Sequence, residues 1–228
     1  IFFGLFIYLD KSKKNKLMLF LITIVFILSE GLIFISGERL ALFFMNLSAI
    51  YIILMIKEYK FYRLSTYVLS LCLIFVLLNF VPNSKERFVD QTIYDFTRNT
   101  DKVYIFSKPH TDMYITAYRM FLDNKFFGVG PRQFRNTCDQ YLVSEYSCET
   151  HPHNTYIELL SEAGIFAFLI VLMLFIILIY ISIKHFIFKF IKSKKNIIND
   201  LEVCLLSAII ISLWPLSPSG SFFNNWMS

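Results

Sequence analysis

Residues 119–170 read RMFLDNKFFGVGPRQFRNTCDQYLVSEYSCETHPHNTYIELLSEAGIFAFLI, and they join the one long polar region of the chain to its longest apolar run. His153 lies at this junction. Because Thr155 and Glu158 form the Ser/Thr-x-x-Glu pattern that begins helices, we expect the imidazole just outside a helix N-terminus. The partial positive charge there disfavours imidazolium, which predicts a neutral histidine able to accept a proton. The alternative is that His153 and Asn154 only cap and orient a membrane helix, since capping sites outnumber catalytic ones.

The composition is that of an integral membrane protein. The 228 residues are 56% hydrophobic, include 26 Phe and have a mean hydropathy of +0.57, values that exclude an ordinary soluble domain. A formal charge of +5 would suggest nucleic acid in a soluble protein, but here Lys and Arg cluster in short gaps between apolar runs, where they set topology. We therefore expect no nucleic-acid binding.

Six apolar runs are candidates for helices across the hydrocarbon core, which needs roughly 17–25 residues per helix. They are 1–9, 17–35, 40–56, 64–81, 157–183 and a weaker run at 197–214. The last is interrupted by Asn199, Asp200 and Glu202, and it is kept because the alternation of the loops requires a crossing there. The chain starts inside an apolar run with no initiator Met or signal-peptide n-region, and it stops just after another. We therefore expect a fragment of a larger polytopic protein.

The basic residues predict which side each gap faces. The gaps 10–16, 57–63 and 184–195 hold 12 of the 22 Lys and Arg residues, so the positive-inside rule makes them cytoplasmic. The other gaps then face outwards. The sequence thus predicts transmembrane helices in 1–81, an extracytoplasmic loop domain at 82–156, transmembrane helices in 157–214 and an outer loop at 215–228.

The predicted outer domain is rich in Tyr, Asp and Asn and has no low-complexity tract, so we expect a partly helical folded cap. Residues 111–121 read as an amphipathic helix, and the segment Gly128-Val129-Gly130-Pro131 reads as a tight turn. The expected apolar face of the helix is Tyr114, Ala117, Tyr118 and Phe121, and the expected polar face is Asp112, Thr116, Arg119 and Asp123.

The four cysteines differ in their predicted depth. Cys72 and Cys204 lie within spans and read as packing residues. Cys138 and Cys148 lie in the outer domain, where an oxidising compartment allows a disulfide that closes a small loop. Their spacing is wrong for a zinc site, and we expect no metal.

Several charged residues lie at the predicted outer face. Arg39 follows a very short connection at the mouth of two helices, and Glu30 lies inside an apolar run, where a carboxylate is costly enough to suggest a function. Arg119, Arg132 and Arg135 bracket the glycine turn. Each arginine alone reads more simply as a solvated charge or an ion-pair partner. Together with a neutral histidine they suit a polyanionic substrate with a hydroxyl to activate, such as a lipid-linked diphosphate.

Two segments, Phe127–Gly130 (FGVG) and His151–Gly164 (HPHNTYIELLSEAG), resemble the signature of the O-antigen ligase and O-antigen polymerase superfamily of bacterial envelopes. Ser36–Arg39 resembles the Ser-x-Arg element of that family, and Arg119 and Gly130 stand in a similar Arg-x10-Gly arrangement. The tail Pro218–Trp226 is similar to the end of the family's last core loop. The resemblance covers most of the chain, which corresponds to the C-terminal half of a typical member.

The resemblance implies a helical bundle of the GT-C type and an inverting, metal-independent glycosyltransferase without a cofactor. The donor would be an undecaprenyl-diphosphate-linked glycan. The acceptor hydroxyl would belong to a glycan, to lipid A-core or to a protein, at the periplasmic face of the bacterial inner membrane. His153 would activate the acceptor, while Arg39 and Arg119 would grip the diphosphate. Further candidates for substrate binding are Arg132, which has no secure family counterpart, Asn154 and Glu30.

Other interpretations stay open. Ligase, polymerase and protein glycosyltransferase differ only in the acceptor, and these residues do not separate them. A transporter or flippase for an anionic lipid would need charges at mid-membrane and helices broken by Gly or Pro, whereas Glu30 is the one charge well inside a span and lies off centre. A purely structural subunit would scatter its outer arginines over the cap.

Overall fold

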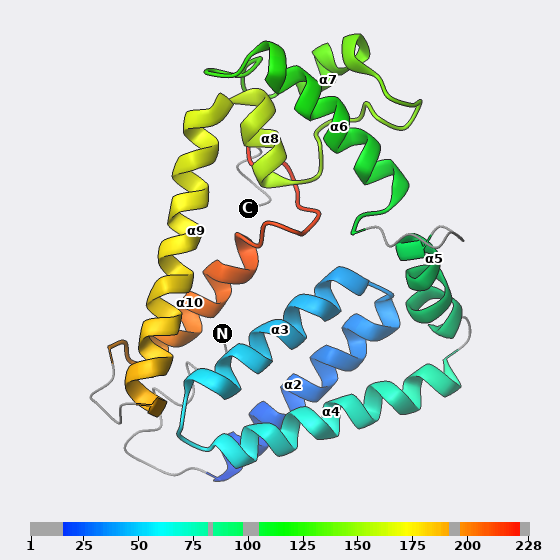
Figure 1. Cartoon of the computed structure of the whole chain (residues 1–228). Helices are drawn as coiled ribbons and strands as arrows, with labels where there is room; N and C mark the ends of the chain where they lie inside the picture. The colour runs from blue at the N-terminus through cyan, green and yellow to red at the C-terminus, as the bar shows by residue number, and fades with distance from the viewer. Residues whose placement is uncertain (1–15, 82–83, 98–104, 192–196, 224–228) are drawn as a thin grey trace. The chain divides into compact units, whose positions relative to one another are not determined.

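The computed structural model describes residues 16–81, 84–97, 105–191 and 197–223, and within these ranges every regular element is helical (Figure 1). The chain divides into two compact units, residues 1–92 with 178–212 and residues 93–177 with 213–228. Three helices among the described residues are long and apolar enough to cross a membrane. The predicted all-helical polytopic fold is therefore confirmed, while the run at 1–9 lies outside the described residues.

The first unit is built on three long helices, α2 (Lys16–Ser36), α3 (Arg39–Met55) and α4 (Lys60–Phe80), with the shorter α10 (Asp200–Ser212) packed on α3. α2 contacts both α3 and α4 (Figure 1). Large apolar side chains such as Leu32 and Phe75 remain 67% and 68% exposed, as expected for surfaces that face lipid. The predicted spans at 17–35, 40–56 and 64–81 correspond closely to these three helices.

Two of the predicted cytoplasmic gaps come together at one end of the first unit. The Nζ atoms of Lys57 and Lys60 lie over the ring of Phe190, 4.9 and 5.7 Å from its centroid. Lys189 lies in the π-helical turn η3 (Ile187–Ile191), and its Nζ atom is 3.9 Å from Glu58 and 3.6 Å from the buried Asp200. Because these gaps share one end of the unit, the geometry agrees with their assignment to the same side of the membrane.

α10 is shorter than the apolar run at 197–214 from which a span was predicted. The backbone N–H of Glu202 donates to Oδ1 of Asn199 at 2.9 Å, and the N–H of Asn199 donates to the carboxylate of Glu202 at 2.6 Å. This reciprocal capping starts the helix at Asp200, so the polar residues that interrupted the apolar run are its N-terminal cap. With 13 residues α10 is below the length of a full span, and a crossing at 197–214 stays a prediction.

The second unit contains α6 (Lys108–Asp123), α7 (Phe134–Thr137), the 3-10 turn η2 (Cys138–Tyr141), α8 (Thr155–Glu162) and the first half of α9 (Gly164–Phe186). The π-helical turn η1 (Glu86–Asp90) belongs to the first unit, and the boundary between the units falls within α5 (Gln91–Thr97). α6 packs against α8 and η2, and Ala117, Met120, Phe134 and Cys138 form a buried apolar cluster. The folded cap that the sequence predicted is thus a small helical core.

The expected single helix at 157–183 is wrong, because the chain breaks between α8 and α9. Gly164 has a φ of +78°, and a Cβ atom there would lie 2.1 Å from the carbonyl oxygen of Phe126. The backbone N–H of Ile165 donates to the carbonyl of Lys125 at 2.9 Å. A glycine that ends one helix in the left-handed region separates a membrane span, Gly164–Ile191, from a short cap helix that precedes it.

The expected faces of α6 also need correction. Met113, Ala117 and Met120 are buried together with Asp112 and Thr116, whereas Tyr118 is 49% exposed. The two polar residues can be buried because they bond within the cap: the hydroxyl of Ser144 donates to Asp112 at 2.8 Å, and the hydroxyl of Thr116 donates to the carbonyl of Tyr141 at 3.4 Å. Arg119 and Asp123 are on the exposed side, as predicted.

Candidate functional site at the start of α8

The N-cap of α8 is Asn154, not Thr155. Its Oδ1 atom accepts hydrogen bonds from the backbone N–H groups of Tyr156 and Ile157 at 3.0 and 3.1 Å. Because Asn154 caps the helix one residue earlier, the hydroxyl of Thr155 is left to bond Ser219 at 3.0 Å. The predicted capping box is therefore wrong, but the prediction that His153 lies just outside a helix N-terminus is confirmed.

Asn154 also anchors the C-terminal loop. Its Nδ2 atom donates to the carbonyl oxygens of Pro215 and Ser217 at 2.9 and 3.1 Å, and the side chain is 2% exposed. An asparagine side chain has two donor hydrogens and two acceptor positions, and these four contacts use them all. In this geometry Asn154 positions the loop at 215–223 and has no remaining group with which to bind a substrate.

His153 lies in a cluster of three histidines. Its Nε2 atom is 2.9 Å from a carboxylate oxygen of Glu149, and its ring centroid is 4.1 Å from that of His151 and 5.9 Å from that of His110. Its φ of +54° is uncommon for a residue with a side chain, and such backbones concentrate at functional loops. The carbonyl of His153 accepts the N–H of Ser219 at 2.9 Å, which fixes the turn.

The two neighbouring histidines favour the neutral form. Burial lowers the pKa of His151, and the charge of His153 lowers it further, against smaller opposing effects of the Ser219 backbone and Glu149. Burial and His153 lower the pKa of His110 in the same way, and burial raises the pKa of Tyr114 beside it to about 12. Burial and the neighbouring imidazole of His153 therefore favour the neutral form of His151 and of His110.

Glu149 and His110 were missed by the sequence analysis. Glu149 precedes His153 by four residues, but the segment between them is not helical, so the helical i, i+4 pattern gave no signal there. His110 reaches the cluster from the first turn of α6, forty-odd residues earlier in the chain, where its Nδ1 atom is 2.7 Å from the hydroxyl of Ser107. Only the packing of α6 on α8 brings it there.

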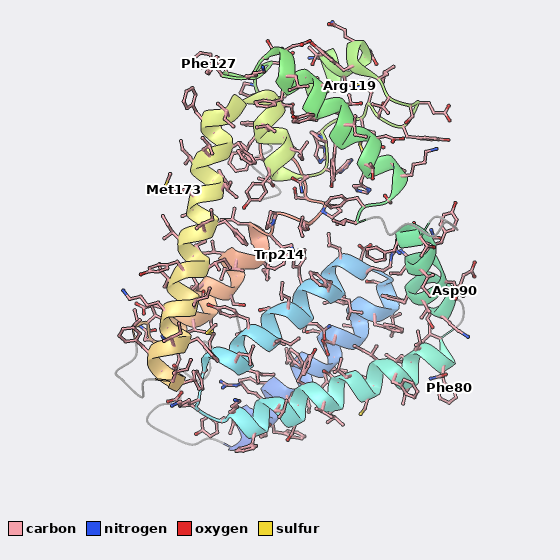
Figure 2. The ribbon with its side chains drawn as sticks, viewed as in Figure 1. Phe80, Asp90, Arg119, Phe127, Met173 and Trp214 are labelled. Carbon is pink, nitrogen blue, oxygen red and sulfur yellow. A yellow bond between two sulfur atoms is a disulfide. The ribbon has the colours of Figure 1, made fainter. Side chains whose placement is uncertain are left out.

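Arg119 lies further along α6 (Figure 2). It is nine residues beyond His110, which corresponds to roughly 13 Å along the helix axis. Its Nη1 atom donates to the carbonyls of Tyr141 and Leu142 at 3.4 and 3.1 Å. Asp123, one turn further along α6, accepts the hydroxyl of Tyr141 at 2.9 Å. Arg119 therefore lies more than two helical turns from His110, and its described contacts do not include the histidine cluster.

The glycine turn and the C-terminal loop are held on α8 by two buried glutamates. Glu162 accepts the backbone N–H groups of Arg132 and Phe134 at 2.6 and 2.8 Å. Glu158 accepts the hydroxyl of Ser221 at 2.5 Å and the N–H of Phe222 at 2.8 Å. Burial raises the pKa of both carboxyl groups against the opposing effect of these donors.

The turn itself fits closely against the end of α8. The N–H groups of Val129 and Gly130 donate to the carbonyls of Ser161 and Glu162 at 2.9 Å each. Gly128 and Gly130 have φ values of +65° and +105°, and a Cβ on Gly128 would lie 2.3 Å from the backbone carbon of Glu162. The tight turn predicted at Gly128–Pro131 is thus confirmed, and its first glycine is required by space as well as by φ.

A cavity of about 350 Å³ opens between the turn, α8 and the C-terminal loop. Its lining side chains are polar or charged: Arg132, Arg135, Thr150, His151, Glu158, Glu162 and Ser221. The guanidinium of Arg132 already donates from Nε and Nη2 to the carbonyl of Phe223, at 3.1 and 2.7 Å. Of the predicted site residues, the structure thus brings Arg132 to a cavity that borders the histidine cluster through His151.

Arg39 and Glu30 belong to the first unit. Nη1 of Arg39 donates to the hydroxyl of Thr92 at 3.1 Å. Glu30 is fully buried in α2, lies beside Ser70 and Asn46, and is not paired with an arginine among the described residues. His153, Arg119 and Arg132 belong to the second unit. The convergence of Arg39 with them stays a prediction.

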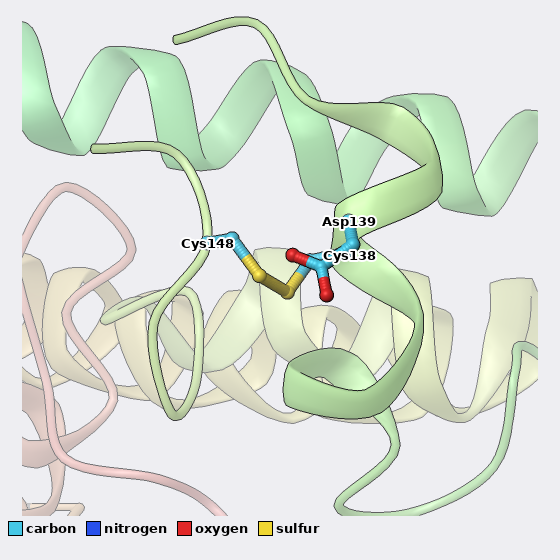
Figure 3. Close-up of side chains that lie close together, drawn as sticks. All are labelled: Cys138, Asp139 and Cys148. Carbon is cyan, nitrogen blue, oxygen red and sulfur yellow. A yellow bond between two sulfur atoms is a disulfide. The ribbon is translucent and has the colours of Figure 1, made fainter. Parts of the chain in front are cut away.

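Cys138 and Cys148 are joined by a disulfide whose Cα atoms are 5.4 Å apart (Figure 3). With Asp139 they form a group whose potential ligand atoms lie within 4.8 Å of one another. Metal binding by cysteine requires thiolates, and a disulfide has none to offer. The group therefore braces the loop between η2 and the histidines and does not fit a metal ion.

Comparison with known proteins shows that most of the region that holds these residues matches a known protein family. The family model described as O-antigen ligase matches residues 22–172, which include Arg39, Arg119 and His153. The teichuronic acid biosynthesis protein TuaE of Bacillus subtilis (strain 168) is 30% identical over 108 residues. This match covers 47% of the chain and only 22% of the relative, so the chain spans a minor part of that protein. No solved structure matches significantly.

Proposed function

Because the chain belongs to the O-antigen ligase family, we propose that it is part of a membrane glycosyltransferase that moves a glycan from a lipid-linked diphosphate to an acceptor hydroxyl. The donor we propose is an undecaprenyl-diphosphate-linked glycan. The acceptor is a glycan, lipid A-core or a protein hydroxyl. The transfer takes place at the periplasmic face of a bacterial inner membrane, without a metal and with inversion at the anomeric carbon.

The observation that carries this proposal is the pair formed by His153 and Glu149. A carboxylate that accepts a hydrogen bond from Nε2–H orients the imidazole and leaves the Nδ1 lone pair to take a proton from a hydroxyl. Burial and the neighbouring His153 lower the pKa of His151 and of His110, so uncharged imidazoles surround the proposed base. A plain helix cap would need only Asn154.

The proposed reaction has one covalent step. The acceptor oxygen attacks the anomeric carbon as His153 takes its proton, and the bond from that carbon to the diphosphate oxygen breaks with its electron pair. The leaving group is undecaprenyl diphosphate, whose growing charge Arg39 and Arg119 would stabilise. Arg132 would contribute to substrate binding from the turn, and Asn154 would position the loop beside the base.

The test uses the full-length protein in a strain that lacks its own copy of the gene. His153→Ala and Arg39→Ala are each expected to abolish surface-polymer formation while the protein still accumulates in the membrane. Lys57→Ala, which removes a basic residue on the predicted cytoplasmic side, is the matched control and should leave the polymer unchanged. Normal polymer from both mutants would overturn the proposal, and glycan analysis of the host with and without the gene would identify the acceptor.

A further inference from the structure

The loop that joins α6 to the glycine turn carries two aromatic side chains outside the core of the second unit. Phe126 and Phe127, which are neighbours in the chain, are 63% and 81% exposed. The buried apolar cluster of this unit, which includes Met120 and Phe134, contains neither ring. Adjacent apolar side chains of this size on a surface indicate a contact with another apolar surface or medium.

The loop packs directly on the first turn of α9. A Cβ atom on Gly164 would lie 2.1 Å from the carbonyl oxygen of Phe126, so the two backbones are in close contact there. The ring centroids of Phe126 and Phe127 lie 6.2 and 6.5 Å from the ring centroid of Phe166, which is in the same first turn. The two rings of the loop therefore have a fixed height along α9.

Height along α9 gives a depth in the bilayer, because α9 is long and apolar enough to cross it. The sequence between Glu162 and Lys184 contains no charged residue. From Gly164 to Lys184 the helix rises by roughly 30 Å at about 1.5 Å per residue, which matches the thickness of the hydrocarbon core. When Lys184 lies at one boundary of the core, Gly164 lies at the other, and Phe166 is about 3 Å inside it. The rings that contact Phe166 are then at the boundary between acyl chains and headgroups.

The exposed apolar surface of α9 continues up to these rings. Leu169, Ile170 and Met173 are exposed residues of the span, and Figure 2 shows Phe127 on the side of α9 from which Met173 projects. Lys125, next to the two rings in the chain, is exposed as well. A lysine at this height can lay its alkyl stem along the apolar surface and place its charge among lipid phosphates. Aromatic rings beside a basic side chain are typical of segments that bind the bilayer interface.

We propose that residues 125–127 are a membrane anchor of the second unit. The rings of Phe126 and Phe127 insert between the acyl chains of the lipids beside the first turn of α9, and the ammonium group of Lys125 reaches the lipid phosphates. Because Gly128 follows directly in the chain, the anchor keeps the glycine turn at the level of the headgroups. This role goes beyond the proposed function, and it holds for any reaction that takes place at the histidines.

The test measures the depth of the loop in the full-length protein in phosphatidylcholine nanodiscs. A fluorescent amino acid replaces Phe127 by amber suppression, and the lipids are brominated either near the headgroup end or near the methyl end of the acyl chain. Headgroup-end bromine should at least halve the fluorescence and should quench more strongly than methyl-end bromine. The same probe in place of Ile170, about 9 Å further along α9 from Gly164, should be quenched at greater depth. In place of Asn136, an exposed residue of α7, it should not be quenched by either lipid.

A probe at Phe127 that neither lipid quenches, while the probe at Ile170 is quenched, would overturn the proposal. Quenching of the Phe127 probe by aqueous iodide would then show that the loop lies in water, and protection from iodide would show that another part of the full-length protein covers it. An unquenched probe at Ile170 would also contradict the anchor, because that face of α9 would not contact lipid. The assay needs no turnover, so its result is independent of whether the protein transfers a glycan.

Discussion

A carboxylate oxygen of Glu149 lies 2.9 Å from the Nε2 atom of His153, and the two residues face each other from a loop that is not helical. The short loop between them is fixed at one end by the disulfide at Cys148 and at the other by the N-cap at Asn154. An imidazole that is oriented by a carboxylate is a common arrangement for a base that takes a proton from a hydroxyl.

Glu149→Gln keeps the size of the side chain but removes its charge. We expect the transfer rate to fall while the apparent affinity for substrate stays the same, since the change affects only the charged form of His153 during the reaction. The loss should lie below that of His153→Ala, which removes a base worth roughly 10²- to 10⁴-fold. Glu145→Gln, on the same loop and exposed, is the control. Equal rates for both variants and the unchanged protein would show that Glu149 has no role in the transfer.

Asn154→Ala should destabilise the second unit in two separable ways. It removes the helix cap, worth about 1 kcal/mol, and it leaves the carbonyls of Pro215 and Ser217 without their donor, at about 1 kcal/mol each. Asn154→Ser keeps an oxygen that can cap α8 but not the donors, so it should recover only the first part. Melting temperatures of the purified variants would check the order, and identical values for Ala and Ser would contradict the capping role.

Gly128→Ala and Gly164→Ala should each destabilise the junction between turn and span. The left-handed backbone alone costs a residue with a side chain about 1–3 kcal/mol. The new Cβ atoms would also meet backbone at 2.3 Å and 2.1 Å, and backbone cannot move aside as a flexible side chain can. Gly220→Ala is the matched control, because nothing lies within 4 Å of its Cβ position. A thermal scan that finds all three variants equal would contradict this packing.

His110→Asn should make the thermal stability of the second unit depend less on pH in the acidic range. Burial and His153 lower the pKa of His110 in the folded state, so the unfolded chain takes up a proton more readily. The contribution of His110 to stability is therefore present above its unfolded pKa of about 6.5 and is lost as the pH falls below it. An asparagine side chain does not titrate in this pH range. The melting temperature of the variant should therefore fall less than that of the unchanged protein between about pH 7.5 and pH 5.5. A parallel decline in both proteins would show that His110 is not the group responsible.

The long membrane helices could be predicted because they depend on composition and length alone. α2 and α4 follow apolar runs long enough to cross a membrane, and α3 is a shorter apolar helix. The basic residues in the gaps agree with the end of the unit where Lys57, Lys60 and Lys189 lie. The glycine turn was equally predictable, because two glycines around one residue favour positive φ at both positions.

The junction at Gly164 was missed because residues 157–183 were taken as one apolar run. Glu158, Ser161 and Glu162 interrupt that run, and the apolar span begins at Gly164. The sequence does not show that the backbone of Phe126 occupies the space that a side chain at Gly164 would fill. The buried face of α6 was mistaken because tertiary contacts decide it. From the sequence, Asp112 and Thr116 are expected on the surface. They are buried because Ser144 and Tyr141, which come later in the chain, form hydrogen bonds with them. Pairs of this kind, Glu149 with His153 among them, are created by tertiary structure and leave no periodic signal in the sequence.

The loop after α10 has a consequence for biogenesis. Three residues bind this loop: Asn154 through Pro215 and Ser217, Glu158 through Ser221 and Phe222, and Arg132 through Phe223. The surroundings of the histidines are therefore completed by a segment that is synthesised more than sixty residues later. During synthesis the carboxylate of Glu158 lacks its hydrogen-bond donors until the ribosome and the insertion machinery have delivered that segment. A truncated product that stops at the end of α10 would therefore be inserted in the membrane yet catalytically silent.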